Sequence, residues 1–557
     1  MFKKMSTHDM RTYRELITPL NIIFTTAFTL VVLIAFNIIP REGAFVFFLL
    51  YALFVLFYPI ERGVDLFLRS IPFFIALPIT ESFDNFNIWR IILALIFIKW
   101  FFVEYTGFLS IRWFQVWMKR KASPRSAAEF TEGMVNGAST EGLNVVIRQT
   151  WKHYRLEVAG ILFLLLASVS VFVGPDTIAG LMRFVFILNA VMLFIVIRSL
   201  VIKNKENAMS FAKNFAYSGI LAVAFGYVQF IAAYFVPAWV FHYWWGQMVS
   251  VAQYGQQWGD ITTNFGNTWF SYSGNTLRLR MFSTFPDSHS FPMYVIMTFP
   301  ALFMWLSGRF GAGFRSHLRV SLVLFVGFGV INLALILSGT RGIWLASVVA
   351  LFVVALFKAT KIDKKYRRIV LSSLLVFLLM FPLYFGIVSF RQFQDTEFDT
   401  SASFARIRSI IDFGETSNQG RIFIWKKSIE YIVHSPVWGV GIGNYPVVLN
   451  EPQSASAAGA SAHNLYLHIA STIGIIGLLA FLWMMFEIVK ESIKYLKTHV
   501  QKGGSDPALG LYIAMMLFSL AWVGAYLMTD AALYDGRALL GFMAMIGMGV
   551  GLMRKNT

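Results

Sequence analysis

Residues 320–357 read VSLVLFVGFGVINLALILSGTRGIWLASVVALFVVALF, two apolar runs separated by the sequence SGTRG at residues 338–342. Each run is close to the length of a helix that crosses a bilayer. The one charge between the two runs, Arg341, lies in the short connection. The stretch is therefore typical of a transmembrane helical hairpin that holds an arginine at the membrane surface.

The whole chain follows the same pattern. Of its 557 residues, 57% are hydrophobic and 14% are charged, whereas a soluble globular chain has about a quarter charged residues. The charges lie in short connections, so the formal net charge of +18 indicates membrane topology and not a nucleic-acid-binding face. The chain has no cysteine, which excludes a thiolate nucleophile, a cysteine zinc site and a disulfide framework.

The apolar segments predict an all-α polytopic membrane protein with about 14 (12–14) transmembrane helices. The third segment is interrupted by Arg69, Pro72 and Pro78, and it is equally compatible with a re-entrant segment. The predicted segments are 20–39, 44–60, 66–80, 88–103, 158–173, 179–201, 215–236, 291–307, 319–338, 342–357, 369–390, 465–488, 508–528 and 537–553.

The basic residues predict the orientation of these segments. The side that holds the N-terminus carries 34 of the 47 Lys and Arg residues, and the other side carries 13. Both termini and a small insertion at residues 104–157 are therefore expected to be cytoplasmic. Two long connections, 237–290 and 391–464, then lie on the outer side, and loops of this length are usually functional or disordered. We expect the site there.

The second long connection contains a predicted amphipathic helix near residues 421–434, in which Trp425 and Ile429 share one face. Pro436 would end it. Three glycines follow at residues 439, 441 and 443, without the strand that a dinucleotide loop requires, and they are interpreted as turn glycines.

Three arginines, Arg280, Arg341 and Arg421, lie on the outer side, where basic residues are scarce. A guanidinium group is permanently charged and offers a planar fork that fits two phosphate oxygens. Arg341 alone could instead extend to the interface without a ligand. Two further arginines on the same side favour a lipid diphosphate.

Histidine is the commonest general base, and His463 lies at the mouth of a predicted span. A plain hydrogen-bonding role is the alternative for a lone histidine there. His289 also lies in an outer connection. His463 and His468 are five residues apart and cannot bind one metal as an i, i+4 pair can, so a zinc site is disfavoured.

Other features of the outer connections are less specific. The acidic residues Asp395, Glu397 and Asp399 lack the glycine and glutamate that a calcium loop needs at its later positions, so no metal site is expected. The first long connection is rich in Trp and Tyr, which would form an interfacial belt or stack on sugar rings.

Four motifs in this order resemble the O-antigen ligase and O-antigen polymerase family, bacterial glycosyltransferases that act at the outer face of the cytoplasmic membrane. The resemblance covers roughly residues 179–553 and leaves out residues 1–178. The motifs are RMFSTF at 280–285, SGTRG at 338–342, GRIFIWKKSIEYIVHSPVWGVGIGNYP at 420–446 and AHNLYLHIASTIGIIGLL at 462–479.

The resemblance implies a GT-C-like fold over residues 179–557, no metal and no cofactor. It further implies a polyprenyl-diphosphate-linked glycan as donor, a glycan or lipid-linked acceptor, contact with membrane lipids and no nucleic acid. The protein would be a multi-pass protein of the bacterial cytoplasmic (inner) membrane.

Residue by residue, Arg341 and Arg421 match the phosphate-binding arginines of the family, and Arg280 matches the arginine of the preceding motif. His463 matches the histidine of the last outer loop and would be the general base. Arg280, His289 and Asn464 are expected to bind substrate. The chain departs from the family at residues 471–472 and 287–289, where the family often has a glutamate and an asparagine.

The predicted function is therefore a membrane glycosyltransferase that transfers or polymerises the lipid-linked glycan at the extracytoplasmic face. We expect inversion at the sugar by single displacement. The alternative is a flippase that binds the same diphosphate without glycosyl transfer. The sequence does not distinguish a ligase from a polymerase.

The predicted orientation can be tested with single cysteines, because the chain has none of its own. A cysteine replacing Ala455 should react with a maleimide that cannot cross the membrane, whereas one replacing Lys364 should react only with a permeant reagent. The measurement is labelling of intact cells. The reverse pattern would show that the orientation, and with it the side of the site, is wrong.

Overall fold

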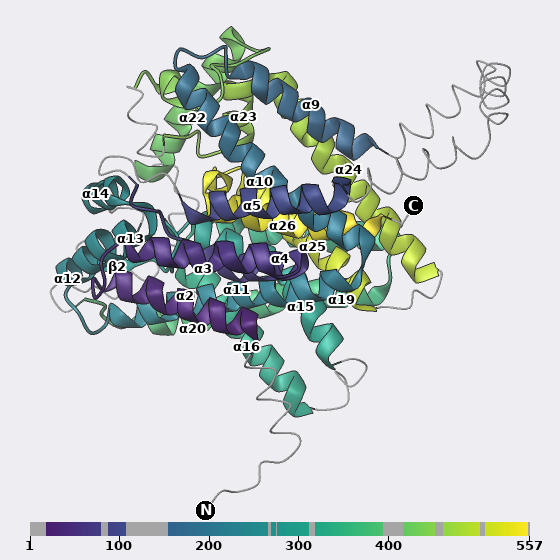
Figure 1. Cartoon of the computed structure of the whole chain (residues 1–557), viewed down its shortest axis with the longest axis horizontal. Coiled ribbons are helices and arrows are strands. Elements are labelled where there is room, and N and C mark those ends of the chain that lie inside the picture. Colours follow the sequence, from purple (N-terminus) through teal and green to yellow (C-terminus); the bar gives the residue numbers. More distant parts are fainter. Residues whose placement is uncertain are drawn as a thin grey trace, which may run out of the picture.

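The computed structural model describes residues 18–79, 87–106, 154–265, 269–273, 276–310, 318–393, 416–451, 460–501 and 507–554. These residues are mostly helical, with one short antiparallel pair of strands (Figure 1). The mostly helical class predicted from the sequence is confirmed. Most of the predicted insertion 104–157, and residues 394–415 and 452–459 of the second long connection, lie outside the described residues.

The centre of the molecule is a group of long apolar helices. They are α10 (Thr177–Lys203), α11 (Glu206–Ala232), α15 (Ser290–Phe310), α25 (Pro507–Tyr526) and α26 (Gly536–Met553). Helix α15 packs against α11, α25 and α26, and α26 also packs along α10. Because α15, α25 and α26 contact helices on more than one side, their apolar residues are mostly buried, whereas α10 and α11 also have exposed apolar side chains.

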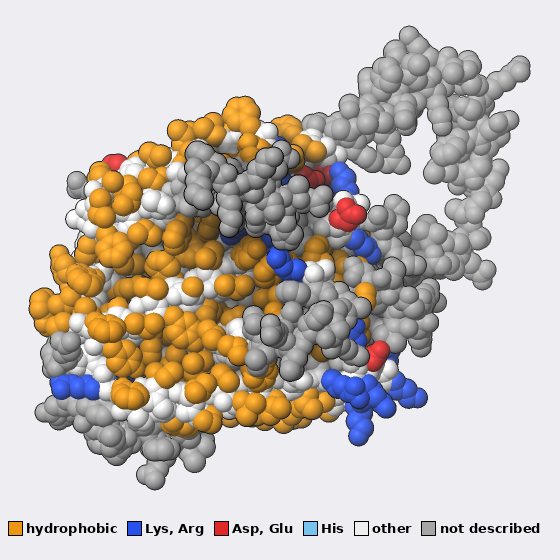
Figure 2. All heavy atoms as spheres, turned by 90° about the horizontal axis from the view of Figure 1, so that it is seen from below, with side chains coloured by type: hydrophobic (Ala, Val, Ile, Leu, Met, Phe, Trp, Pro, Cys, Tyr) orange, Lys and Arg blue, Asp and Glu red, His pale blue; other side chains and the backbone are white. Residues whose placement is uncertain are grey.

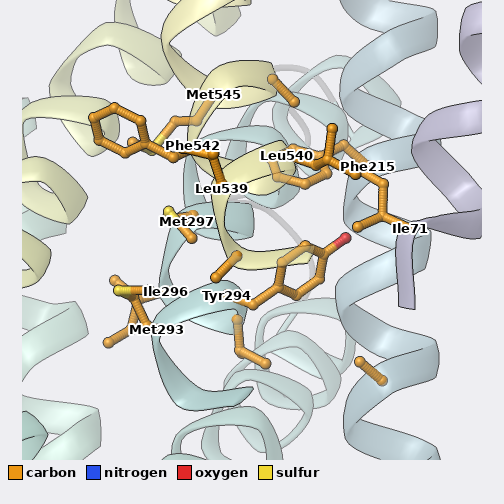
Figure 3. Close-up of a cluster of buried hydrophobic side chains, with 14 of the residues drawn as sticks. Ile71, Phe215, Met293, Tyr294, Ile296, Met297, Leu539, Leu540, Phe542 and Met545 are labelled. Atoms are coloured by element: carbon orange, nitrogen blue, oxygen red, sulfur yellow. The ribbon is translucent and has the colours of Figure 1, made fainter. Parts of the chain in front are cut away.

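Buried side chains from α11, α15 and α26 interlock in this centre (Figure 3). The ring of Tyr294 fits against Gly541, where a Cβ atom would lie 2.8 Å from the ring. The hydroxyl of the same tyrosine lies 2.7 Å from Ser218 Oγ, so the one polar atom of the ring has a partner. The glycine therefore permits close packing of α15 and α26.

The N-terminal helices cover one side of this centre. They are α2 (Pro19–Ala35), α3 (Gly43–Phe57), α4 (Ile60–Ser70) and α5 (Ile88–Phe101). Helix α4 ends at Ser70, and a short 3₁₀ turn follows, so the third predicted segment does not form one continuous helix. Asp65 and Arg69 of α4 both bind Asn214 of α11 through hydrogen bonds of 2.8 and 2.9 Å. The buried charges thus attach the N-terminal helices to the centre.

A second layer combines helices that are far apart in the sequence: α9 (Arg155–Ser170) packs along α24 (Ile475–Gln501) (Figure 1). The predicted segment 465–488 is divided at Gly474 into α23 (Leu465–Ile473) and α24. Gly474 has φ +90°, and a Cβ there would lie 1.8 Å from the carbonyl oxygen of Val437, so only glycine fits the break.

The predicted helix near residues 421–434 is confirmed as α22 (Thr416–His434), although it begins earlier and Ile429 is exposed. The glycines at 439, 441 and 443 all have positive φ, as expected for turns. Backbone atoms of Ser471, Gly174 and Ala179 lie where their Cβ atoms would be. These turns therefore pack α22 closely against α23 and the loop before α10.

The first long connection is folded, which the sequence did not predict. It contains α12 (Ala238–Tyr243), a π-helical turn (Trp244–Ser250), α13 (Val251–Tyr254) and α14 (Gln256–Phe265). Strands β1 (Phe270–Ser273) and β2 (Thr276–Leu279) form an antiparallel pair in which Phe270 lies opposite Leu279. This pair leads directly to Arg280.

Seven helices in the described part of the chain are long and apolar enough to cross a membrane. Three more apolar helices are shorter, and the predicted number of about 14 spans is not confirmed. Figure 2 shows a surface on which hydrophobic side chains cover a broad area, as expected for contact with lipid tails. The remaining apolar helices between α15 and α22 are α16 (Leu318–Leu337), α17 (Arg341–Ala346), α18 (Ala350–Ala359), α19 (Lys364–Leu379) and α20 (Phe381–Val388).

Candidate active site

Arg280 holds the short connection between α16 and α17 in place. Its Nε donates to the carbonyl oxygen of Ser338 at 3.2 Å, and its Nη2 donates to Thr340 Oγ1 at 3.2 Å. Thr340 Oγ1 in turn donates to the carbonyl oxygen of Ser288 at 2.6 Å. Arg280 is 8% exposed. Two motifs that are 58 residues apart in sequence are therefore joined through charge-assisted hydrogen bonds.

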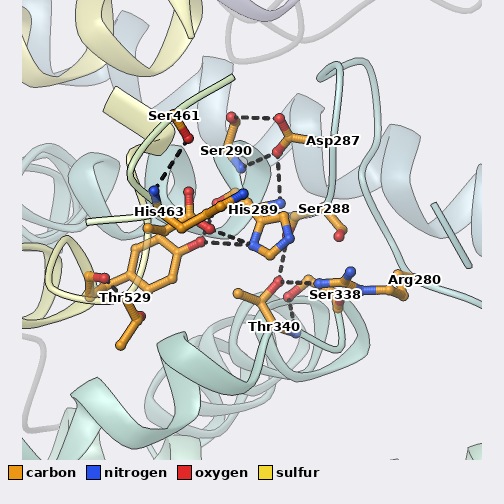
Figure 4. Close-up of polar contacts among 12 residues, drawn as sticks. Arg280, Asp287, Ser288, His289, Ser290, Ser338, Thr340, Ser461, His463 and Thr529 are labelled. Atoms are coloured by element: carbon orange, nitrogen blue, oxygen red, sulfur yellow. Dashed lines mark hydrogen bonds and ion pairs between the residues drawn. The ribbon is translucent and has the colours of Figure 1, made fainter. Parts of the chain in front are cut away.

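His289 lies at the beginning of α15 (Figure 4). Asp287 Oδ1 accepts hydrogen bonds from the backbone N–H groups of His289 and Ser290 at 2.8 and 2.7 Å, which is typical of a residue that caps a helix. His289 Nδ1 lies 3.0 Å from Asp530 Oδ2, an ion-pair distance, and 3.2 Å from the Tyr526 hydroxyl. The side chain is thus oriented by Tyr526 at the end of α25 and by Asp530 in the loop that follows.

His463 lies in the loop before α23 and has φ +43°, an unusual backbone conformation for a residue other than glycine. The backbone N–H of Leu465 donates to the carbonyl oxygen of Leu527 at 2.8 Å, which ties this loop to the loop that carries Asp530. His463 Nδ1 is buried and has no hydrogen-bond partner among the described residues. An observed backbone outlier of this kind often marks a functional residue.

The charges around His463 and Asp530 act on one another. Burial lowers the pKa of His463, Arg421 and His289 lower it further, and Asp530 acts in the opposite direction. Burial alone would raise the pKa of Asp530, but His289, His463 and Arg421 together hold it below its usual value. The site thus combines a neutral imidazole with an ionised carboxylate at neutral pH.

Arg421 is contributed by α22, and its charge acts on both His463 and Asp530. Arg341 begins α17 and is half-buried. The next residue, Gly342, packs directly against the ring of Tyr526 and the hydroxyl of Thr529. The backbone that carries Arg341 therefore lies beside the loop of Asp530.

Asn464 caps α23. Its Oδ1 accepts hydrogen bonds from the backbone N–H groups of Tyr466 and Leu467 at 3.0 and 3.1 Å. The amide oxygen already accepts hydrogen bonds from the helix, so the amide nitrogen is the atom that would contact a substrate. The predicted substrate-binding role of Asn464 stays a prediction.

The structure brings Arg280, His289, Arg421 and His463 close together from separate motifs. For Arg341 it places the backbone beside the loop of Asp530. Figure 4 shows His289 and His463 close to each other, with Arg280 and Thr340 at the hairpin. Asp530 and Tyr526 were not predicted from the sequence, and Asp287 stood out only as part of a departure from the family. The signal that could have found Asp530 is an acidic residue in a short connection on the side that carries the arginines.

This arrangement suits a reaction in which an anionic leaving group departs and a hydroxyl loses a proton. Fixed guanidinium groups can stabilise the growing negative charge, and a neutral histidine can accept the proton. Among the described residues, no group of three or more His, Cys, Asp or Glu side chains is placed to hold a metal ion.

Comparison with known protein families gives a match over part of the chain. Residues 320–482 match the family model described as O-Antigen ligase. No curated protein matches the chain. The matched segment contains Arg341, Arg421 and His463, whereas Arg280, His289 and the loop of Asp530 lie outside it.

The contact at Gly342 generates a test of how the site is assembled. A Cβ there would lie 2.5 Å from Thr529 Oγ1 and 3.0 Å from the ring of Tyr526, which is 1% exposed. Gly342→Ala should therefore reduce the stability by about 1–3 kcal/mol. The measurement is thermal unfolding in detergent, followed by tryptophan fluorescence.

Gly386→Ala in α20 is the matched control, because its Cβ would meet no atom within 4 Å. The helix propensity of alanine should leave this variant unchanged or slightly more stable. Equal unfolding temperatures for the two variants would contradict the close packing of α17 on the loop 526–530.

Proposed function

Because the chain belongs to the O-antigen ligase family through residues 320–482, we propose that it is a membrane glycosyltransferase of bacterial surface-polysaccharide assembly. It transfers or polymerises a glycan carried on a polyprenyl diphosphate, at the outer face of the cytoplasmic membrane. The observation that carries the proposal is the convergence of His463, Arg421 and the His289–Asp530 pair from separate motifs.

In the proposed reaction, Arg341 and Arg421 bind the diphosphate of the donor. The acceptor oxygen attacks the anomeric carbon of the sugar while the bond between that carbon and the diphosphate oxygen breaks. The electron pair of the broken bond goes to the diphosphate, whose charge the arginines stabilise in a site that contains little water, an effect worth several kcal/mol. His463 accepts the proton of the acceptor hydroxyl.

Several observations support His463 as the base. Its lowered pKa keeps the imidazole neutral at physiological pH, and the buried Nδ1 has no partner among the described residues. His289 Nδ1, in contrast, already lies 3.0 Å from Asp530. We therefore assign His289 and Asp530 to positioning and charge balance. Fixed arginines would do the work of a metal ion, so the reaction requires none.

The division of roles predicts different defects in variants. His463→Ala removes the proton acceptor alone, so the rate constant should fall by roughly 10²- to 10⁴-fold with donor affinity little changed. Arg341→Ala and Arg421→Ala should weaken donor binding as well as turnover. Lysine at either position keeps the charge but loses the planar fork and should rescue activity only in part. The measurements are donor binding and initial rates in proteoliposomes.

His434→Ala is the matched control, because His434 is exposed at the end of the same α22 that carries Arg421. It should retain the wild-type rate. A His463→Ala protein with a near-normal rate would transfer the role of base to His289. Donor movement across the membrane by a His463→Ala protein, without any glycosyl transfer in the wild type, would favour the flippase alternative.

The pH dependence tests the same assignment. The reaction requires neutral His463, so the rate should fall as pH drops through its pKa, which lies below the ordinary value of 6.5. Asp530→Asn removes a charge that favours protonated His463 and should move this acid limb to lower pH. Arg421→Gln removes a charge that opposes protonation and should move the limb to higher pH. The measurement is the pH–rate profile of each variant.

Each profile is normalised to its own maximum, because both substitutions also reduce the rate itself. Opposite shifts of the two variants are the expected result. An acid limb at the same pH in wild type and both variants would contradict His463 as the titrating base.

A further inference from the structure

Two arginines outside the site described above face the same aromatic ring. Arg90 lies in the first turn of α5, and Arg183 lies near the start of α10. Their guanidinium carbons are 5.7 and 5.3 Å from the centroid of Phe186. Both side chains are half-buried. Two positive charges are thus held close together by packing.

The pair has no anionic partner among the described residues. The charge of Arg183 acts unfavourably on Arg90, and no ion pair between described residues includes either side chain. Arg90 Nε is buried without a hydrogen-bond partner in the described part of the chain. Two other arginines have an anionic partner: the half-buried Arg198 pairs with Glu157 at 2.5 Å and the buried Arg554 with Glu157 at 3.0 Å, although the Nε atoms of both also lack a hydrogen-bond partner among the described residues.

Stacking on aromatic rings does not by itself offset the free-energy cost of two partly buried positive charges that repel each other. A cation–π contact contributes about 0.5–2 kcal/mol, whereas a partly buried charge without a counter-ion is costly. The stacked guanidinium groups keep their in-plane N–H donors, which are the groups that bind phosphate oxygens in pairs. An anion between the two arginines would relieve the repulsion and could accept the hydrogen bond that Arg90 Nε lacks among the described residues.

The pair is connected to the candidate active site through aromatic side chains. The Arg183 guanidinium carbon lies 4.8 Å from the centroid of the Tyr534 ring, and that ring lies 4.4 Å from the ring of His468. The charges of Arg183 and His463 both act on His468. Tyr534 belongs to the same loop as Asp530. By the predicted topology, all of these residues lie toward the outer side.

We propose that Arg90 and Arg183 form a second anion site that binds a phosphate group beside the candidate active site. The ligand is a phosphate carried by a substrate or by a membrane phospholipid. The substrate form of this proposal rests on the proposed function, whereas the phosphate site itself does not. Arg90 and its neighbour Trp89 come from the N-terminal helices, outside the segment that matches the family. The N-terminal helices would then contribute to ligand binding.

The experiment is calorimetric titration of the full-length protein in a nonionic detergent with inorganic diphosphate. Wild type should show two classes of site. Arg421→Ala should remove one class, and the double variant Arg90→Gln/Arg183→Gln should remove the other or weaken it roughly tenfold or more. Arg198→Gln, at the opposite end of α10 from Arg183, is the matched control and should keep both classes.

Titration in phosphatidylcholine nanodiscs with and without phosphatidylglycerol distinguishes the two sources of phosphate. If the site takes a phospholipid headgroup, phosphatidylglycerol should block the class that depends on Arg90 and Arg183. If it takes a substrate phosphate, this class should persist. If wild type showed only the class of site that depends on Arg90 and Arg183, and not the class that depends on Arg421, the result would count against the proposed function. The second site would still be supported.

Thermal unfolding gives an independent readout. Diphosphate should raise the unfolding temperature of Arg421→Ala but not that of a protein that also lacks the Arg90–Arg183 pair. Should the double variant not fold, Arg183→Lys keeps the charge and should bind the diphosphate more weakly than wild type. Unchanged diphosphate binding in the double variant or in Arg183→Lys, with a lower unfolding temperature, would show that the pair is purely structural and would overturn the proposal.

Discussion

The hydrogen bonds of the Arg280 guanidinium are the interaction on which the arrangement of the candidate site depends. They fix the hairpin between α16 and α17 against the segment that precedes α15. Thr340 extends this connection to the carbonyl oxygen of Ser288, one residue before His289. A buried guanidinium must satisfy its donors. The position of the hairpin, and so of Arg341, is therefore coupled to the position of His289.

A second constraint comes from glycines that allow backbones to approach closely. Gly474 separates α23 from α24, and the turn glycines 439–443 pack α22 against α23 and the loop before α10. This packing brings Arg421 of α22 near the loop of His463. The placement of the charged residues of the site thus depends on glycines at which a side chain would clash with neighbouring backbone atoms.

The sequence predicted those features that local patterns determine. Apolar runs predicted the helices, the amphipathic pattern predicted α22, and Pro436 predicted its end. The family resemblance placed Arg280, Arg341, Arg421 and His463 in one site, and the structure brings their segments together, although their chemical roles remain predictions. The sequence motifs could not show that Arg280 donates hydrogen bonds to the hairpin at residues 338–340, because that contact is long-range.

The features that the sequence did not predict are those that depend on tertiary contacts. Asp530 follows an apolar helix and has no motif around it, and it becomes part of the site only because α15 packs against α25. The strands β1 and β2 form within a connection whose aromatic residues suggested an interfacial belt or a sugar-binding surface. The number of spans depends on tertiary contacts in the same way, since the buried charges of α4 find partners on α11 and α2, which local sequence patterns do not show.

In the proposed function, this chain itself forms a glycosidic bond from a diphosphate-linked donor. The most direct measurement is to incubate the purified protein with a defined polyprenyl-diphosphate glycan and candidate acceptors in EDTA, and to determine the masses of the products. We expect an acceptor that is heavier by the mass of the transferred glycan, together with released polyprenyl diphosphate. His463→Ala should form product at no more than about 10⁻² of the wild-type rate. Intact donor and unmodified acceptor would contradict the proposed function, as would transfer that appears only after Mg²⁺ or Mn²⁺ is added.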